Sequence, residues 1–175
     1  SDRIDVNHWR MKKEYLILLL ITWALVAEAQ NQLPTSSFVV RGAVTREVTI
    51  TQQDLLRLPV QELGDVVITN HLGEKKSEIR QVQGVRLRDA LQSVEIAEAS
   101  PRLLSEYFFV FRSRDGYTVV YSWNEIFNAR SGERFFLVVG KDGKKMSELD
   151  DAILMLAPDD QRTGRRYLKS LSTVD

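Results

Sequence analysis

Short runs of β-branched and aromatic residues, separated by polar residues, glycine or proline, recur along the chain from residue 37 onward. Such runs are typical of β-strands. They predict strands at residues 37–44, 46–52, 65–70, 77–82, 107–113, 117–122, 134–140, 152–158 and 167–174. Asp115-Gly116 joins two of these runs and predicts a tight hairpin, because glycine accepts the positive φ angle that such turns need.

Helical signals in the same region are few and short. The segments 51–58 and 122–127 each begin with a capping-box pattern, and Pro59 ends the first of them. Residues 85–94 place their apolar side chains close to one helical face. Short helices interspersed among more numerous strands predict an α+β domain with a mixed or largely antiparallel sheet.

The N-terminal part has the pattern of a secretory signal peptide. From Met11, a short basic stretch precedes about thirteen apolar residues, and Ala27-Glu28-Ala29 fits a cleavage site. We expect upstream residues at 1–10, a signal peptide at 11–29, a flexible lead-in at 30–37 and one domain at 38–175. The expected location is periplasmic or secreted. The alternative is an uncleaved anchor, in which case the signal sequence would be the contact with the membrane.

Composition narrows the possible functions. The 175 residues include 24 Lys and Arg and 24 Asp and Glu, so the formal net charge is zero and nothing indicates a nucleic-acid partner. The chain contains no cysteine, which excludes disulfides, thiolate nucleophiles and thiolate metal ligands. With two histidines in the chain, a zinc site of the usual kind is not expected.

His71 follows Asn70 where the predicted strand 65–70 runs into a polar loop. Histidine changes charge near neutral pH, so His71 could bind a ligand or act as a base. A base needs a nucleophile, an orienting carboxylate and a place for the oxyanion, and the sequence around His71 indicates none of these. The alternative is a solvent-exposed loop histidine.

Two groups of arginines could recognise an anion, because a guanidinium presents a two-pronged donor to carboxylate or phosphate. Arg112 and Arg114, together with Asp115, flank the hairpin, and the alternative is a charged tip that keeps the edge soluble. Arg165 and Arg166 belong to a loop rich in Asp and Arg, and the alternative there is a solvated, self-paired charge cluster.

Several short segments match, in order, the motifs of one known family. They are Gly84–Leu91 (pattern GVxLxDxL), Phe111–Ser122 (with Asp-Gly-Tyr), Glu125-Ile126, Phe136–Lys144, the LMLAPDDQR run at 154–162 and Arg166–Lys169. Together these segments resemble the molybdopterin-binding oxidoreductase domain of the sulfite-oxidase type, over roughly residues 38–174. The resemblance implies a sulfite-oxidase-type molybdopterin-binding fold.

In catalytic members of that family, a cysteine thiolate ligates molybdenum at the end of the strand that corresponds to residues 65–70. This chain has Thr69-Asn70-His71 around that point and no cysteine. A carboxamide or an imidazole is a poor replacement for a soft thiolate. The resemblance therefore implies a compact, exported relative that keeps the fold without the metal ligand.

We expect an exported, non-catalytic binding or accessory module with no catalytic residue, no metal and no cofactor. It would recognise a small molecule or an exported partner protein through one cleft. The residues expected in that cleft are Asn70, His71, Arg112, Arg114, Asp115, Tyr117, Arg165 and Arg166. One alternative is a periplasmic molybdopterin-dependent oxidoreductase, or a subunit of one, that holds the pterin through Arg112, Arg165 and Arg166. Another alternative is a structural partner of an exported enzyme.

Overall fold

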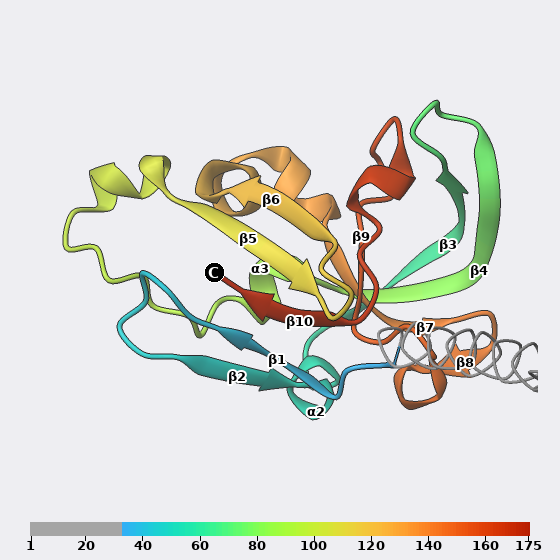
Figure 1. Ribbon diagram of the computed structural model, residues 1–175, viewed down its shortest axis with the longest axis horizontal. Helices are drawn as coiled ribbons and strands as arrows, with labels where there is room; N and C mark the ends of the chain where they lie inside the picture. The colour runs from blue at the N-terminus through green and yellow to red at the C-terminus, as the bar shows by residue number, and fades with distance from the viewer. Residues whose placement is uncertain (1–32) are drawn as a thin grey trace, which may run out of the picture.

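The first of two β-sheets has five strands in the order β2-β1-β10-β5-β6 (Figure 1). The computed structural model describes residues 33–175. The strands of this sheet are β1 (Ser37–Val40), β2 (Val48–Thr51), β5 (Phe108–Ser113), β6 (Thr118–Ser122) and β10 (Leu171–Val174). β1 and β10 are parallel, and the other neighbours are antiparallel. The prediction of a mixed, largely antiparallel arrangement is confirmed.

The second sheet contains β3, β4, β7 and β8 in that order, and β9 also pairs with β7. Its strands are β3 (Val60–Thr69), β4 (Lys75–Arg86), β7 (Phe136–Lys141), β8 (Lys144–Lys145) and β9 (Leu154–Leu156). All of its pairs are antiparallel. β3 and β4 form a long hairpin, which reaches upward at the right of Figure 1 and stands away from the first sheet.

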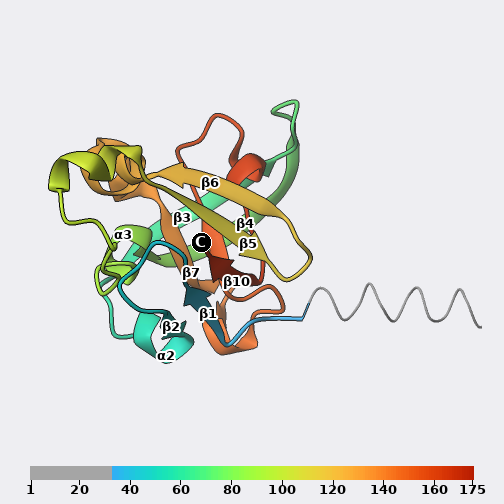
Figure 2. The ribbon, with the colours of Figure 1, turned by 60° about the vertical axis from the view of Figure 1, so that its left-hand side comes forward.

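The helices are short and lie between strands. They are α2 (Gln52–Leu55), α3 (Leu87–Ala90), η1 (Pro101–Glu106), η2 (Asn124–Asn128), η3 (Arg130–Arg134), η4 (Met146–Glu148) and η5 (Thr163–Arg166). With two sheets and short helices, the domain is α+β (Figure 2).

The capping patterns are confirmed in both places. The Thr51 hydroxyl accepts from the backbone N–H of Asp54 (3.2 Å), and the Asp54 carboxylate accepts from the backbone N–H of Thr51 (2.9 Å). Ser122 and Glu125 make the same reciprocal pair, at 3.1 and 2.8 Å. Each pair satisfies backbone donors that a helix start leaves free. The hairpin is confirmed as well, because β5 pairs with β6 and Gly116 has φ 87°.

One hydrophobic core joins the inward faces of both sheets. Phe111 and Tyr121 contribute from the first sheet and Leu137 and Leu154 from the second, each almost fully buried. The Tyr121 ring packs edge-on against Phe135, with ring centroids 4.7 Å apart. Because the core is continuous, both sheets belong to one folded unit.

The helix predicted at residues 85–94 is much shorter in the structure. Val85 and Arg86 end β4, where they pair with Leu137 and Phe136 of β7, and the helix α3 covers only Leu87–Ala90. The apolar pattern of residues 85–94 is also compatible with the end of a buried strand followed by a short helix. The pairing of β4 with β7 therefore overrides the local helical pattern.

The chain is attached to the domain from Thr35 onward. The Thr35 hydroxyl donates to the carbonyl of Ala152 (3.1 Å) and accepts from the N–H of Ile153 (2.8 Å). Gln52 donates to the Thr35 carbonyl (2.8 Å). The end of the segment predicted as a flexible lead-in is thus packed and hydrogen-bonded. The predicted signal peptide at 11–29 lies outside the described residues, and no helix within 33–175 has the length and apolar character to cross a bilayer.

Candidate functional site

A groove of about 480 Å³ lies where the end of β3 meets the segment from η5 to β10. The residues that line it are Ile68, Thr69, Asn70, His71, Lys76, Tyr117, Gly164, Arg165, Tyr167 and Lys169. The structure therefore brings together four of the eight residues predicted for one cleft. These four are Asn70, His71, Tyr117 and Arg165.

The turn η5 lies directly against the end of β3. The Thr163 hydroxyl donates to the carbonyl of Val67 (2.7 Å) and accepts from the N–H of Thr69 (3.0 Å). At Gly164 a Cβ atom would lie 2.0 Å from the Thr69 carbonyl oxygen, so only glycine fits. This close contact fixes the position of Arg165 at the wall of the groove.

The hairpin between β5 and β6 also contacts this turn. The Tyr117 hydroxyl donates to the carbonyl of Arg165 (2.7 Å), while 44% of Tyr117 stays exposed. Lys169 places its ammonium 5.7 Å from the centre of the Tyr167 ring. The groove therefore has aromatic surface beside its charged groups.

Asn70 shapes the loop rather than facing a ligand with free polar atoms. Its side-chain oxygen accepts from the N–H groups of Leu72 (2.9 Å) and Glu74 (3.0 Å). Its amide nitrogen donates to the Glu74 carboxylate (2.8 Å). These bonds hold the 70–74 turn and so place His71, the next residue, at the groove.

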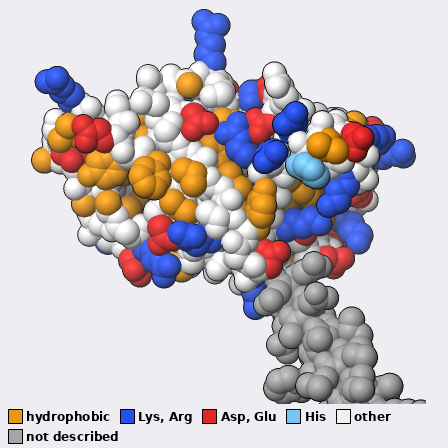
Figure 3. Space-filling model, turned by 45° about the horizontal axis from the view of Figure 1, so that its top comes forward, with side chains coloured by type: hydrophobic (Ala, Val, Ile, Leu, Met, Phe, Trp, Pro, Cys, Tyr) orange, Lys and Arg blue, Asp and Glu red, His pale blue; other side chains and the backbone are white. Residues whose placement is uncertain are grey.

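The groove is cationic. Its lining includes Lys76, Arg165, Lys169 and His71 and no Asp or Glu. None of these four forms an ion pair with another residue of the described chain. Figure 3 shows Lys and Arg side chains gathered on this face, beside a histidine. Positive charges that converge without a carboxylate produce a local potential that attracts anions.

Arg166 does not line the groove, although it follows Arg165 directly. Its guanidinium lies over the adjacent rings of Tyr121 (4.6 Å to the centroid) and Phe135 (4.7 Å). Two of its nitrogens bind the Asp160 carboxylate at 2.7 and 2.5 Å, and a third lies 3.2 Å from Glu125. The hydrogen bond to Asp160 raises the pKa of Arg166, and burial raises the pKa of Tyr121. Arg166 is thus paired within the protein. This agrees with the alternative of a self-paired charge cluster and not with a role in anion binding.

Arg112 and Arg114 also lie outside the groove. Arg112 pairs with Asp175 (3.3 Å), and Arg41 binds the same carboxylate at 2.7 Å. The hydrogen bond from Arg41 is the main reason that the pKa of Asp175 is lowered. Arg114 is exposed at the hairpin tip, where its backbone N–H donates to the carbonyl of Ser170 (3.0 Å).

Asp115 has a structural role in the hairpin and lines a different recess. Its carboxylate accepts from the Ser113 hydroxyl and from the N–H of Tyr117 (3.2 Å). These hydrogen bonds, that from Ser113 first, lower the pKa of Asp115. The carboxylate is therefore held in its ionised form, and some of its acceptor positions are occupied by groups of its own hairpin.

The sequence prediction did not include six residues of the groove, and three of these have polar or charged side chains that reach its surface: Lys76, Tyr167 and Lys169. Tyr167 and Lys169 are two residues apart in the segment predicted as a strand at 167–174, and an extended segment presents every second residue on one side. This spacing of two was a usable signal for Tyr167 and Lys169. Nothing local distinguishes Lys76 from its neighbour Lys75, which pairs with Glu78 at 2.5 Å.

The residues at the end of β3 do not suit a molybdenum site of the kind found in the sulfite-oxidase-type family, which this sequence resembles. No thiolate is available, the Asn70 side chain is used within its own turn, and the Thr69 hydroxyl is buried away from the groove surface. Within residues 33–175, no group of three or more His, Asp or Glu side chains is arranged to hold a metal. The donor set offers oxygen and imidazole nitrogen where a soft ligand is required.

Comparison with protein-family models gives no match, and comparison with curated proteins gives none either. Among solved structures, the sulfane dehydrogenase SoxCD from Paracoccus pantotrophus is similar, with a TM-score of 0.58 and 13% identity. The similarity covers 79% of this chain and 37% of the SoxCD chain. The fold is thus distantly similar to part of an oxidoreductase, and at this identity the similarity concerns the fold alone.

Proposed function

We propose that this domain is an exported, non-catalytic binding module with a sulfite-oxidase-type fold, and that its groove binds a small oxoanion. The observation that carries the proposal is the convergence of Lys76, Arg165 and Lys169 with His71, without a carboxylate among the lining residues. Ammonium and guanidinium groups donate strong, charge-assisted hydrogen bonds to oxoanions. A bound anion would also offset the repulsion among these like charges.

The fold part of the proposal rests on two independent observations. The motif order along the chain resembles the sulfite-oxidase type, and the arrangement of elements is similar to that of SoxCD. The non-catalytic part rests on the donor set, because the end of β3 carries Thr69, Asn70 and His71 in place of a thiolate. Export rests on the signal-peptide pattern at residues 11–29.

Titration of the purified full chain with inorganic phosphate and sulfate tests the anion site. We expect saturable binding by calorimetry, with Lys76→Met and Arg165→Met each weakening the affinity about fivefold to tenfold, since each removes one charge from the groove. Arg114→Met is the matched control, because it removes the same charge from an exposed residue that does not line the groove. Equal weakening by all three variants would show non-specific attraction and overturn the groove assignment.

The non-catalytic assignment has its own test. We expect protein purified from cells that make molybdenum cofactor to contain neither molybdenum nor pterin in stoichiometric amount, because no soft ligand is present at the end of β3. Elemental analysis and pterin fluorescence measure this directly. Molybdenum and pterin at about one per chain would favour the oxidoreductase alternative.

A further inference from the structure

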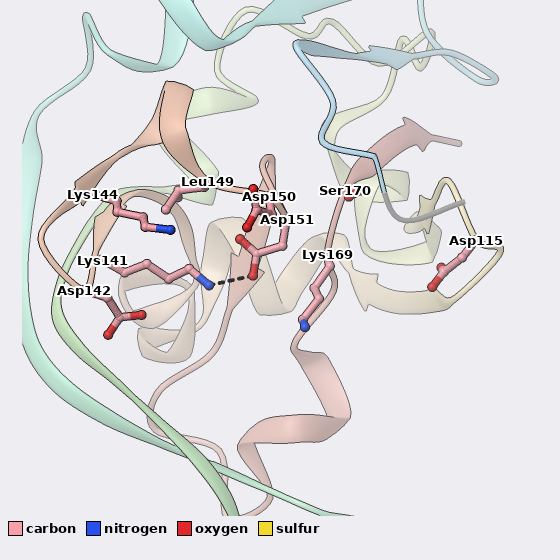
Figure 4. A pocket seen from close by; sticks show the side chains of 9 residues that line it. All are labelled: Asp115, Lys141, Asp142, Lys144, Leu149, Asp150, Asp151, Lys169 and Ser170. Atoms are coloured by element: carbon pink, nitrogen blue, oxygen red, sulfur yellow. Dashed lines mark hydrogen bonds and ion pairs between the residues drawn. The ribbon is translucent and has the colours of Figure 1, made fainter. Parts of the chain in front are cut away.

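A second recess, of about 350 Å³, lies next to the groove and shares Lys169 with it. Its lining residues are Asp115, Lys141, Asp142, Lys144, Leu149, Asp150, Asp151, Lys169 and Ser170. Figure 4 shows the residues of the 141–151 segment on one side and Asp115 on the other, with Lys169 and Ser170 between them. Unlike the groove, this recess carries charges of both signs.

One ion pair is built into the wall of the recess. Lys141 binds Asp151 at 2.6 Å, and their side chains are 11% and 14% exposed. Tyr167 adds a contact of 3.4 Å to the Lys141 ammonium. Burial is the largest single effect and lowers the pKa of Lys141, but the hydrogen bond to Asp151 and the electrostatic interactions with Tyr167 and Asp151 together outweigh it, so the pKa is raised. The other oxygen of Asp151 is buried and has no hydrogen-bond donor among the described residues, so Asp151 forms part of the wall and does not present a free oxygen to the recess.

Other charged groups of the recess are not paired. Lys144, Asp150 and Lys169 form no ion pair with any residue in 33–175. The two remaining carboxylates are partly used, since Asp115 accepts bonds within its hairpin and Asp142 accepts from the N–H of Arg80 (2.8 Å). The recess thus offers one free carboxylate and two free ammonium groups.

We propose that this recess is a second binding site, and that it takes a small zwitterion of the α-amino acid class. The ligand ammonium would bind Asp150, a carboxylate of the recess that has no ion-pair partner within residues 33–175. The ligand carboxylate would bind Lys144 and Lys169. A volume of about 350 Å³ is within the range of small-molecule sites and admits an amino acid or a dipeptide.

Calorimetric titration of the full chain with glycine tests this site, with ethylamine and acetate as ligands that carry a single charge. We expect glycine to bind at one per chain and both control ligands to bind at least about tenfold more weakly, because each makes only half of the contacts. Asp150→Asn and Lys144→Met should each weaken glycine binding about fivefold or more. Both residues are exposed, so the folded state should persist, and circular dichroism verifies it.

Lys76→Met separates this site from the groove. It should leave glycine binding within about twofold, whereas Asp150→Asn should leave phosphate binding within the same limit. Absence of glycine binding at about 10 mM ligand would overturn the second site, while phosphate binding to the groove would stand. Equal affinity for glycine and ethylamine would overturn the role of Lys144 and Lys169 as carboxylate ligands.

Discussion

Replacement of Arg166 by methionine is expected to lower the free energy of unfolding by about 3 kcal/mol, because it leaves a half-buried carboxylate without its partner. Asp160 is 19% exposed at its side chain and receives two hydrogen bonds from Arg166. The substitution also removes a guanidinium that lies over the rings of Tyr121 and Phe135. Methionine keeps most of the apolar contact, so the loss reports mainly on the charge and its hydrogen bonds.

Arg165→Met is the matched control for this prediction. It makes the same chemical change one residue earlier, at a side chain that is exposed and unpaired in the described structure. We expect its free energy of unfolding to stay within about 0.5 kcal/mol of the wild type, as for most surface substitutions. Urea denaturation of both variants measures the difference. Similar values for the two would mean that the Arg166 cluster is an ordinary surface ion pair.

A double-mutant cycle identifies the source of the loss. If the lone carboxylate is the main cost, Asp160→Asn should recover a substantial part of the stability that Arg166→Met removes. No recovery would assign the loss to the aromatic contacts of the guanidinium instead. Either result fixes what the cluster of Asp and Arg residues does at this position.

Local signals explain which parts of the fold the sequence predicts. The Asp-Gly hairpin and the capping pairs at Thr51 and Ser122 depend on residues close together in the chain, and all three form as expected. The structure of residues 85–94 is decided by more than the local pattern, which predicted a helix over the whole segment. The hydrogen bonds that β4 makes with β7 come from residues about fifty positions away, and they convert Val85 and Arg86 to strand.

The groove could be predicted only in part, for a similar reason. Arg165 and Arg166 are neighbours with the same side chain, and the docking of η5 on β3 determines which of them faces the groove. Arg112 finds its partner in Asp175, a residue 63 positions away. A single sequence gives residue types and spacings, but the choice between a free and a paired arginine depends on such long-range contacts.

Gly164→Ala is expected to destabilise the domain by about 3 kcal/mol, at the upper end of the usual cost of overpacking. Its Cβ would lie 2.0 Å from the Thr69 carbonyl oxygen and 3.2 Å from the carbonyl carbon. These are backbone atoms of β3, so no side-chain rotation can relieve the contact. The turn η5 must move away, and the two hydrogen bonds of Thr163 to β3 would be strained with it.

Gly116→Ala is the comparison that isolates this steric cost. At Gly116 a Cβ would meet nothing within 4 Å, but the residue has φ 87°, so alanine there should cost about 1 kcal/mol through backbone strain alone. Gly164 is not among the glycines with positive φ, so the stability lost in Gly164→Ala measures the steric clash of the added Cβ and not backbone strain. Thermal and urea unfolding of both variants test the order of the two effects.

The same substitution connects stability to the proposed anion site. Arg165 follows Gly164 directly, and its carbonyl accepts from the Tyr117 hydroxyl, so displacement of η5 should move the Arg165 side chain out of the groove. We therefore expect Gly164→Ala to weaken phosphate binding about fivefold or more at temperatures where the variant is still folded. Unchanged phosphate affinity in a destabilised variant would mean that η5 does not position the anion-binding residues.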